Sequence, residues 1–111
     1  MKEKQHTSSG SLAVKAGMNA AIELFHKRWT LRILWELRDH PHNFRAIQAA
    51  CADLSSSVLN VRLSELREAQ LLAHDEQGYA LTEWGKELLE AMQPFSQWAA
   101  RWHRATSSPK R

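Results

Sequence analysis

Residues 54–72, LSSSVLNVRLSELREAQLL, decide how the rest of the chain folds. A helix that begins at Ser55 places residues three and four apart over one another. One narrow sector then gathers Leu59, Leu63, Leu66 and Gln70. We expect this stripe to face the core.

The opposite face of this helix is polar and carries short side chains. It holds Ser57, Val61, Ser64 and Glu68, with Ser56 and Asn60 towards one flank. Three consecutive serines supply an N-cap and free N–H groups, which suit a phosphate oxygen at a helix N-terminus. The second helix of a helix-turn-helix reads bases in this posture. An ordinary amphipathic surface helix with a serine cap is the alternative interpretation.

Length and composition indicate one small globular domain. The chain has 111 residues, of which 43% are hydrophobic and 24% charged, and five tryptophans are unusual at this size. The longest apolar run is too short to span a bilayer, and the first ten residues lack the apolar centre of a signal peptide. These features predict a cytoplasmic protein with no membrane segment. Cys51 is the single cysteine, so an internal disulfide and a CxxC site are excluded.

The charge distribution permits an anionic partner without demanding one. Net charge is +3 with a pI near 9.4. Residues 27–45 hold five basic residues against two acids, whereas residues 71–100 hold five acids and one lysine. Any nucleic-acid contact would therefore depend on the elements that precede the 55–70 helix.

The region before this helix reads as a lead-in followed by two helices. Residues 1–15 are polar and predict a flexible N-terminal segment. A short helix over residues 18–26 follows, capped by Asn19. The next helix starts at a Thr30 cap, stops at Pro41 and has a broad apolar face. That face consists of Leu31, Ile33, Leu34 and Leu37.

A third short helix and a tight turn complete a helix-turn-helix. Phe44, Ile47 and Cys51 repeat at helical spacing, and residues 53–55 form the turn before the 55–70 helix. His40 and His42 lie in the preceding loop without a companion cysteine or carboxylate at metal spacing. We therefore expect a loop there, with no metal and no cofactor.

The segment after Leu72 predicts a β-hairpin. A turn signal at Glu76, Gln77 and Gly78 separates two short extended segments, and a hairpin in this position is a wing. Asp75 and Glu76 near its tip would repel phosphate. We expect little DNA contact from this wing.

The last helix predicts a dimer. Thr82 caps it, Pro94 should bend or break it, and large aromatic side chains recur along it. A domain this small has little core left to bury them, so a second copy of the chain is expected to cover them. The alternative is that the helix folds back onto its own domain. The predicted dimer residues are Ile22, Phe25, Trp84, Leu88, Phe95, Trp98 and Trp102.

Three segments in order carry a family resemblance. KRWTLRILWELRDHPHNFRAI (27–47), LSSSVLNVRLSELREAQLL (54–72) and YALTEWGKELL (79–89) resemble the HxlR-type winged helix-turn-helix transcriptional regulators. These are bacterial repressors and activators that bind operators as dimers. The resemblance covers residues 16–98 and implies a mainly helical fold with a small β-hairpin wing, in which N- and C-terminal helices dimerise. We expect a domain over residues 16–105 and a flexible tail over residues 106–111.

The resemblance also implies residue roles. By position, Ser56, Ser57, Asn60, Val61 and Arg62 face DNA, and the helices around Ile22 and Trp98 form the dimer. Many members have a reactive cysteine at the start of the first helix, where this sequence has Ala16, so thiol-based sensing does not carry over. The wing is also shorter and more acidic than is usual for the family.

These observations predict a sequence-specific regulator that binds double-stranded DNA as a homodimer, with the 55–70 helix in the major groove. Asn60 is expected to pair with adenine and Val61 to touch a thymine methyl, while serines and arginines hold phosphates. The complete predicted DNA surface is Arg45, Ser55, Ser56, Ser57, Asn60, Val61, Arg62 and Ser64.

Three alternatives to a DNA-binding regulator alone differ in how well they fit the sequence. A winged-helix module that binds protein, with little DNA binding, fits the near-neutral helix and the acidic wing. A small apolar effector in a tryptophan-rich cleft is compatible with the regulator. An enzyme is not expected, because the sequence has no nucleophile–base set, no glycine-rich phosphate loop and no metal spacing.

Overall fold

The computed structural model describes residues 2–107, with side chains from Gly10 onward. The chain forms two units, Met1–Leu31 and Arg32–Arg111. The elements in chain order are α1 (Lys2–Phe25), α2 (Thr30–Glu36), α3 (Phe44–Ala50), α4 (Ser56–Glu68), β1 (Leu72–Asp75), β2 (Gly78–Leu81), α5 (Glu83–Ala91) and α6 (Gln93–Ser107). This order confirms the predicted mainly helical fold with one β-hairpin. None of the helices within the described residues is long and apolar enough to cross a membrane.

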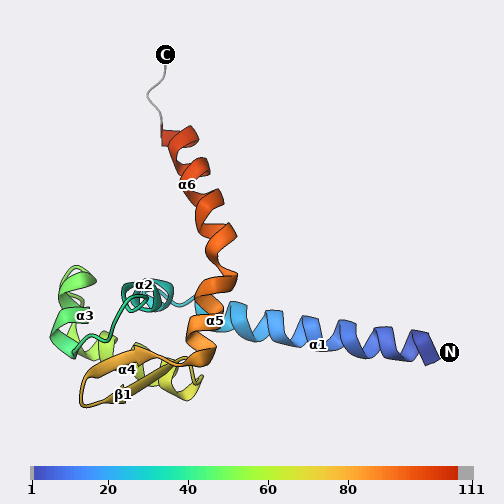
Figure 1. Cartoon of the computed structure of the whole chain (residues 1–111), viewed down its shortest axis with the longest axis horizontal. Helices are drawn as coiled ribbons and strands as arrows, with labels where there is room; N and C mark the ends of the chain where they lie inside the picture. The colour runs from blue at the N-terminus through green and yellow to red at the C-terminus, as the bar shows by residue number, and fades with distance from the viewer. Residues whose placement is uncertain (1, 108–111) are drawn as a thin grey trace. The chain divides into compact units, whose positions relative to one another are not determined.

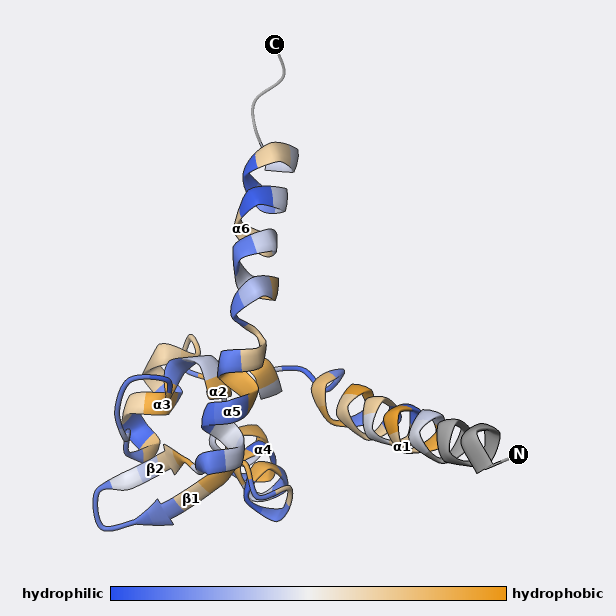
Figure 2. Ribbon diagram, turned by 45° about the vertical axis from the view of Figure 1, so that its right-hand side comes forward, coloured by the Kyte–Doolittle hydropathy of each residue, from blue (hydrophilic) through white to orange (hydrophobic). Residues whose placement is uncertain are grey.

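The first unit is dominated by the long helix α1, whose hydrophobic turns are orange in Figure 2. The prediction of a short helix that starts at an Asn19 cap is wrong, because α1 begins at Lys2 and Asn19 lies inside it. Residues 11–16, SLAVKA, contain good helix formers and no proline, so nothing in them stops the helix. Val14, Met18 and Ile22 repeat every four residues along α1 and are 56–67% exposed.

The second unit has a small core that three helices and the hairpin build. The core consists of Ile33, Leu34, Leu37, Ile47, Cys51, Leu59, Leu63, Leu66 and Leu72, each at most 3% exposed. The predicted stripe of α4 is confirmed at its three leucines and wrong at Gln70. That residue is exposed and lies beyond the helix, where its backbone is left-handed with φ 65°.

Gln70 ends α4 in a Schellman motif. The Leu71 N–H donates to the Leu66 carbonyl at 3.0 Å, and the Gln70 N–H donates to the Arg67 carbonyl at 2.9 Å. This pattern satisfies two carbonyls at the helix end and requires a left-handed residue at the position of Gln70. The chain therefore turns sharply into β1.

The helix α2 departs from its predicted bounds at both ends. It ends at Glu36, well before Pro41, and the Arg38 N–H closes a tight turn on the Trp35 carbonyl at 3.2 Å. Thr30 does not cap it. The Thr30 hydroxyl is buried and has no hydrogen-bond partner among the described residues. Leu34 and Leu37 still reach the core, so the predicted apolar face is confirmed there.

The hairpin is tied to the loop before α3. β1 and β2 pair antiparallel, with Leu72 opposite Leu81 and Asp75 opposite Gly78. Tyr79 also exchanges two backbone hydrogen bonds with His42, at 2.8 and 3.0 Å. Gly78 has φ 119°, and a Cβ there would lie 2.5 Å from the His42 carbonyl oxygen. The loop and the hairpin therefore meet with no room for a side chain at Gly78.

Thr82 and Gly85 join α5 to the end of α4. The Thr82 hydroxyl donates to the Gln70 carbonyl at 2.6 Å and accepts from the Gly85 N–H at 3.1 Å. The predicted Thr82 cap is thus confirmed. Gly85 is buried, and a Cβ there would lie 2.5 Å from the Leu71 carbonyl oxygen. The Leu-Thr-x-x-Gly pattern is therefore a close-packed joint between these elements.

The predicted break near Pro94 is confirmed. α5 ends at a Met92 C-cap and α6 starts at Gln93, so Pro94 occupies the first turn of a new helix, where its missing N–H has no partner to lose. α6 has no buried residue and extends away from the other elements of its unit (Figure 1). It also continues to Ser107, beyond the predicted boundary at residue 105. Residues 108–111 of the predicted tail lie outside the described residues.

Candidate nucleic-acid interface

The interface is built on the helix-turn-helix of α3 and α4. The Asn43 side chain caps α3 by accepting from the Ala46 N–H at 2.8 Å. Ala52 and Asp53 then both adopt φ 58°, a left-handed conformation that reverses the chain within two residues. The turn is therefore held by backbone geometry that is uncommon outside glycine.

Gln48 clamps this turn to the start of α4. Its side-chain amide donates to the Leu54 carbonyl at 2.8 Å and to the Ser56 hydroxyl oxygen at 3.2 Å. The carbonyl of Gln48 accepts from the Asp53 N–H at 2.8 Å. One residue of α3 thus fixes both ends of the turn. Gln48 was not predicted as a site residue, because its role depends on two contacts six and eight residues away.

A second polar contact closes the C-terminal end of α3. Arg32 donates to the Ala50 carbonyl at 3.0 Å and holds Glu36 at 2.7 Å. A cation at this position satisfies a free carbonyl and complements the helix dipole. These contacts fix α3 against α2, so α4 is presented from a rigid support.

The start of α4 is capped by a serine, as predicted. The Ser55 hydroxyl accepts from the Val58 N–H at 3.3 Å and confirms the cap. Ser56 and Ser57 follow in the first turn and are both exposed. The first N–H groups of a helix have no partner within it, so this end offers donors to an anion.

The outward face of α4 carries four of the eight predicted DNA residues. Ser57 precedes Asn60 by three residues and Val61 by four, and Ser64 follows them by four and three. All four are exposed, Val61 by 49%. Arg45 on α3 is exposed as well. The structure thus brings one short-chained polar face together, on the side of α4 opposite its buried leucines.

Two arginines of α4 differ in their setting. Arg62 lies on the flank of the helix, where its guanidinium contacts the Glu65 carboxylate at 3.3 Å and its side chain is 21% exposed. Arg67 is exposed and lies seven residues after Asn60, on the same side of the helix. Arg67 was not among the predicted DNA residues. Its spacing from Asn60 was the signal that could have placed it on this face.

The wing tip is negative. Asp75 and Glu76 are exposed, and the Asp75 carboxylate accepts from the Gln77 N–H at 2.8 Å, which holds the turn. His74 and Tyr79 stack across the strands with ring centres 3.9 Å apart. The tip therefore presents no cation to a phosphate.

Cys51 lies in the core behind this interface. It is 1% exposed, and burial raises the pKa of its thiol above the ordinary value, with a smaller lowering by Arg32 and a raising by Glu36. A buried, protonated thiol reacts slowly. Within the described residues, no group of three His, Cys, Asp or Glu side chains is placed to hold a metal ion.

An aromatic surface on α6 has no cover within its unit. Phe95 and Trp98 stack with ring centres 5.8 Å apart, and Trp98 and Trp102 stack at 5.5 Å. These three side chains are 46–55% exposed, and Trp84 on α5 is 62% exposed. Leu88 is half-buried. Of the other predicted dimer residues, Ile22 is 56% exposed and Phe25 half-buried, both on α1.

Comparison with known proteins agrees with this geometry. Residues 24–107 match the family model described as HxlR-like helix-turn-helix. The chain is 33% identical over 89 residues to an uncharacterised HTH-type transcriptional regulator, YvaP, of Bacillus subtilis, covering 74% of this chain and 82% of that one. A second uncharacterised regulator of this type, from Methanocaldococcus jannaschii, is 31% identical over 83 residues, which cover 71% of this chain and 78% of that one.

Two solved structures have the same fold as this chain. Quinone-bound YodB of B. subtilis superposes with a TM-score of 0.72 at 31% identity, covering 78% of this chain and 98% of YodB. A possible HxlR family factor of Thermoplasma volcanium superposes with a TM-score of 0.67 at 26% identity, covering 75% of this chain and 81% of that one. The chain therefore belongs to the HxlR-like family of helix-turn-helix transcriptional regulators, a family of DNA-binding proteins and not of enzymes.

Proposed function

We propose that this regulator binds operator DNA sequence-specifically as a homodimer, with α4 of each subunit in the major groove. The observation that carries the proposal is the outward face of α4. Its polar residues are short, exposed and held by the Gln48 clamp, so base edges can approach the helix closely. Two such helices, one from each subunit, would enter successive major grooves about 34 to 36 Å apart.

Roles follow from the chemistry of each side chain. Asn60 is suited to a bidentate pair with adenine, and Val61 to contact with a thymine methyl. Ser55, Ser56, Ser57 and Ser64, with the helix N–H groups, are suited to phosphate and sugar oxygens. Arg45 and Arg67 are exposed and can reach phosphates, whereas Arg62 must exchange its contact with Glu65 to do so. The acidic wing tip is assigned no phosphate contact.

The dimer is proposed from exposed aromatic surface. Phe95, Trp98 and Trp102 form a stacked row on a helix with no buried residue, and α1 carries a second exposed apolar stripe. Aromatic residues that stay this exposed are typical of interface anchors. A two-fold pairing through α1 and α6 would cover Ile22, Phe25, Trp84, Leu88 and the α6 row in both copies.

A small effector is part of the proposal. YodB was solved with a quinone bound, and we extend to this chain the binding of a small planar molecule. The family resemblance implies a reactive cysteine at the position of Ala16, and Cys51, the single cysteine, is buried. The effector is therefore expected to bind without forming a bond to sulfur.

DNA selection tests the DNA-binding part. An operator selected from a random duplex library, then titrated by fluorescence anisotropy, should bind with an affinity that falls steeply between 50 and 200 mM salt, on the order of a thousandfold for about six phosphate contacts. Asn60→Ala should cost roughly 1 to 3 kcal/mol at one base position, and Arg67→Ala should weaken all sequences alike.

The matched control is Gln97→Ala, on the exposed surface of α6. It should leave both base preference and salt dependence unchanged. A folded dimer that binds no duplex at low salt would instead support the protein-binding alternative. An Asn60→Ala variant with unchanged base preference would remove the adenine assignment.

A further inference from the structure

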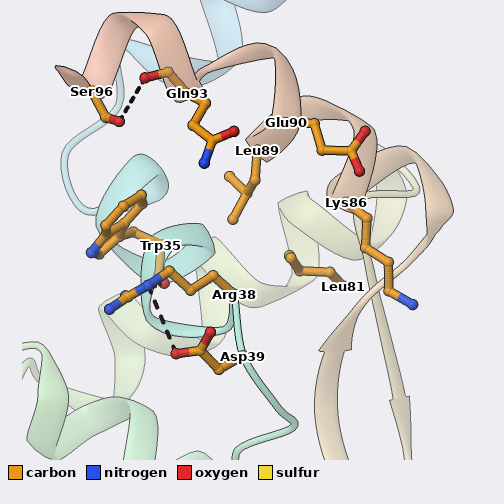
Figure 3. A pocket seen from close by; sticks show the side chains of 9 residues that line it. All are labelled: Trp35, Arg38, Asp39, Leu81, Lys86, Leu89, Glu90, Gln93 and Ser96. Atoms are coloured by element: carbon orange, nitrogen blue, oxygen red, sulfur yellow. Dashed lines mark hydrogen bonds and ion pairs between the residues drawn. The ribbon is translucent and has the colours of Figure 1, made fainter. Parts of the chain in front are cut away.

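A cleft in the second unit lies where the DNA-reading domain meets the start of α6. Its volume is about 430 Å³. Trp35 of α2 lies on one side with Arg38 and Asp39 of the turn that follows, and Leu81, Leu89 and Gln93 come from β2, α5 and α6. In Figure 3, Leu89 and Gln93 point from the upper helices towards Trp35 and Arg38. This volume falls within the range of small-molecule sites.

One wall of the cleft is a preorganised aromatic and cationic pair. The Arg38 guanidinium lies over the Trp35 ring, 4.2 Å from the ring centre, and its Nη1 donates to the Trp35 carbonyl at 2.9 Å. Its Nε lies 3.8 Å from the Asp39 carboxylate. Among the described residues, the remaining nitrogen, Nη2, has no hydrogen bond or ion pair. A fixed guanidinium with unused donors can orient a ligand oxygen at little entropic cost.

The other lining residues set the charge and shape that fit. Leu81 and Leu89 are half-buried and supply apolar surface, and Trp35 is 42% exposed, so a flat ring can lie against it. Asp39 and Glu90 oppose Arg38 and Lys86, so the lining has no net charge. A charged group in the ligand would lose its hydration in a lining that supplies no net opposite charge.

We infer that this cleft is the effector site, and that it takes an uncharged planar aromatic molecule with an oxygen acceptor at one end. The ring lies between Trp35 and Leu89, and the acceptor receives a hydrogen bond from Arg38 Nη2. This inference rests on the proposed function, because it gives the effector of the regulator a location and a chemical class.

The position of the cleft explains how ligand binding there would alter DNA binding. Gln93 belongs to the first turn of α6, directly after the Met92 cap that separates α5 from α6. A ligand held between Trp35 and Gln93 contacts both α2 and the start of α6. A bound ligand therefore favours one orientation of α6 relative to the rest of the second unit. In the proposed dimer, that orientation sets the distance between the two α4 helices.

A series of probes with matched rings tests the ligand class. Acetophenone, benzoate and benzylammonium share one ring and differ in charge. Each is titrated into the ¹⁵N-labelled full chain without DNA, following the indole N–H signal that Trp35→Phe removes. Acetophenone should bind about tenfold more tightly than either ion, because the ions lose more hydration on entry. Benzoate or benzylammonium binding more tightly would overturn the assigned class.

Variants test the location. Leu89→Phe fills the cleft and should abolish acetophenone binding. Trp35→Leu removes the flat wall but keeps apolar bulk, and should weaken binding about five- to tenfold. Arg38→Met should weaken it about fivefold, whereas the matched control Arg101→Met, on the exposed surface of α6, should leave it unchanged. Circular dichroism checks that each variant is folded. Unchanged affinity in folded Leu89→Phe and Trp35→Leu would overturn the site.

The last step separates this inference from the proposed function. Acetophenone should change the operator affinity of the unmodified protein at least about threefold, which is a small allosteric coupling. It should not change the operator affinity of Leu89→Phe. A chain that binds acetophenone but never binds DNA would remove the proposed function while the cleft stands. A chain that binds DNA but shows no response to acetophenone would remove the regulatory role of the cleft.

Discussion

The helices α4 and α6 have similar lengths, but the apolar stripe of α4 is buried and that of α6 is exposed. Leu59, Leu63 and Leu66 repeat along α4, and each is at most 2% exposed. Phe95, Trp98 and Trp102 repeat along α6 at comparable spacing, yet they are 46–55% exposed. The apolar stripe of α4 is completed by its own chain, whereas the stripe of α6 is not. An amphipathic pattern thus predicts that a surface will be covered without saying which molecule covers it.

The ends of the two helices differ in the same way. The start of α4 is fixed by Ser55 and the Gln48 clamp, and its end by the Schellman motif at Gln70. α6 is held at its start by the Met92 junction, and from Phe95 onward its rings contact one another. A helix that reads DNA needs a fixed direction relative to its domain, and a helix that joins two subunits can gain its direction from the partner.

The largest expected effect comes from breaking the stripe of α4. Leu59→Ala should lower the free energy of unfolding by about 2 to 5 kcal/mol, because it removes buried methyl groups and leaves a cavity. Chemical denaturation measures this change. Val61→Ala, on the exposed face of the same helix, should change stability by less than about 0.5 kcal/mol. Equal losses in the two variants would contradict the assignment of the buried face.

Breaking the row on α6 should act on assembly and not on folding. Trp98→Ala should weaken dimer formation by about 2 kcal/mol, roughly thirtyfold in the dimer dissociation constant, because central aromatic residues dominate interfaces. Analytical ultracentrifugation gives the constant, and circular dichroism reports the fold. Gln97→Ala, the neighbouring residue, is the control. A Trp98→Ala variant that unfolds, or that dimerises as well as the unmodified chain, would count against the proposed interface.

A substitution at the C-terminal end of α4 should have a smaller effect on stability. Gln70→Gly should raise the free energy of unfolding by about 0.5 to 1 kcal/mol, because glycine adopts the left-handed conformation of Gln70 without steric cost. Glu65→Gly, inside the last two turns of α4, should lower stability by about 1 kcal/mol. Thermal and urea unfolding give both values. A loss of stability in Gln70→Gly would mean that its side chain contributes more than its backbone conformation costs.

The smallest effect should be visible only at alkaline pH. The pKa of the Cys51 thiol is raised in the folded state from the ordinary 9.0, so the thiol stays neutral there while it ionises in the unfolded chain. Stability from this difference is fully present below pH 9.0 and is lost as the pH rises towards the folded pKa. Urea midpoints between pH 8 and about 10.5 should therefore fall more steeply in the unmodified chain than in Cys51→Ala. Parallel slopes would show that the thiol is not shielded.

Local pattern was enough to predict much of the DNA-binding domain. The period of the leucines placed α4, Ser55 and Thr82 were found as caps, and Pro94 marked the break between α5 and α6. These features depend on residues within one turn of each other. The three motifs that resemble the family were sufficient to order them into the correct fold.

Other features depend on contacts that spacing does not reveal. Gln48 was missed because its partners lie across the turn, and Gln70 was placed on the core stripe because its left-handed backbone cannot be read from a helical period. Asn19 and Thr30 have the side chains of caps, but α1 starts earlier and the Thr30 hydroxyl is buried. The site roles of α4 and the dimer residues remain predictions that only binding experiments test.

The hydrogen bonds between His42 and Tyr79 limit how this protein can vary in evolution. They join the root of the hairpin to the loop before α3, and Gly78 leaves no space between the two. An insertion at the root would move that loop and, through α3, the helix α4. The turn between Asp75 and Gly78 lies beyond this attachment and is exposed at Glu76 and Gln77. Homologues are therefore expected to gain or lose wing residues at the tip, where a basic extension could add minor-groove contacts without disturbing how α4 is held.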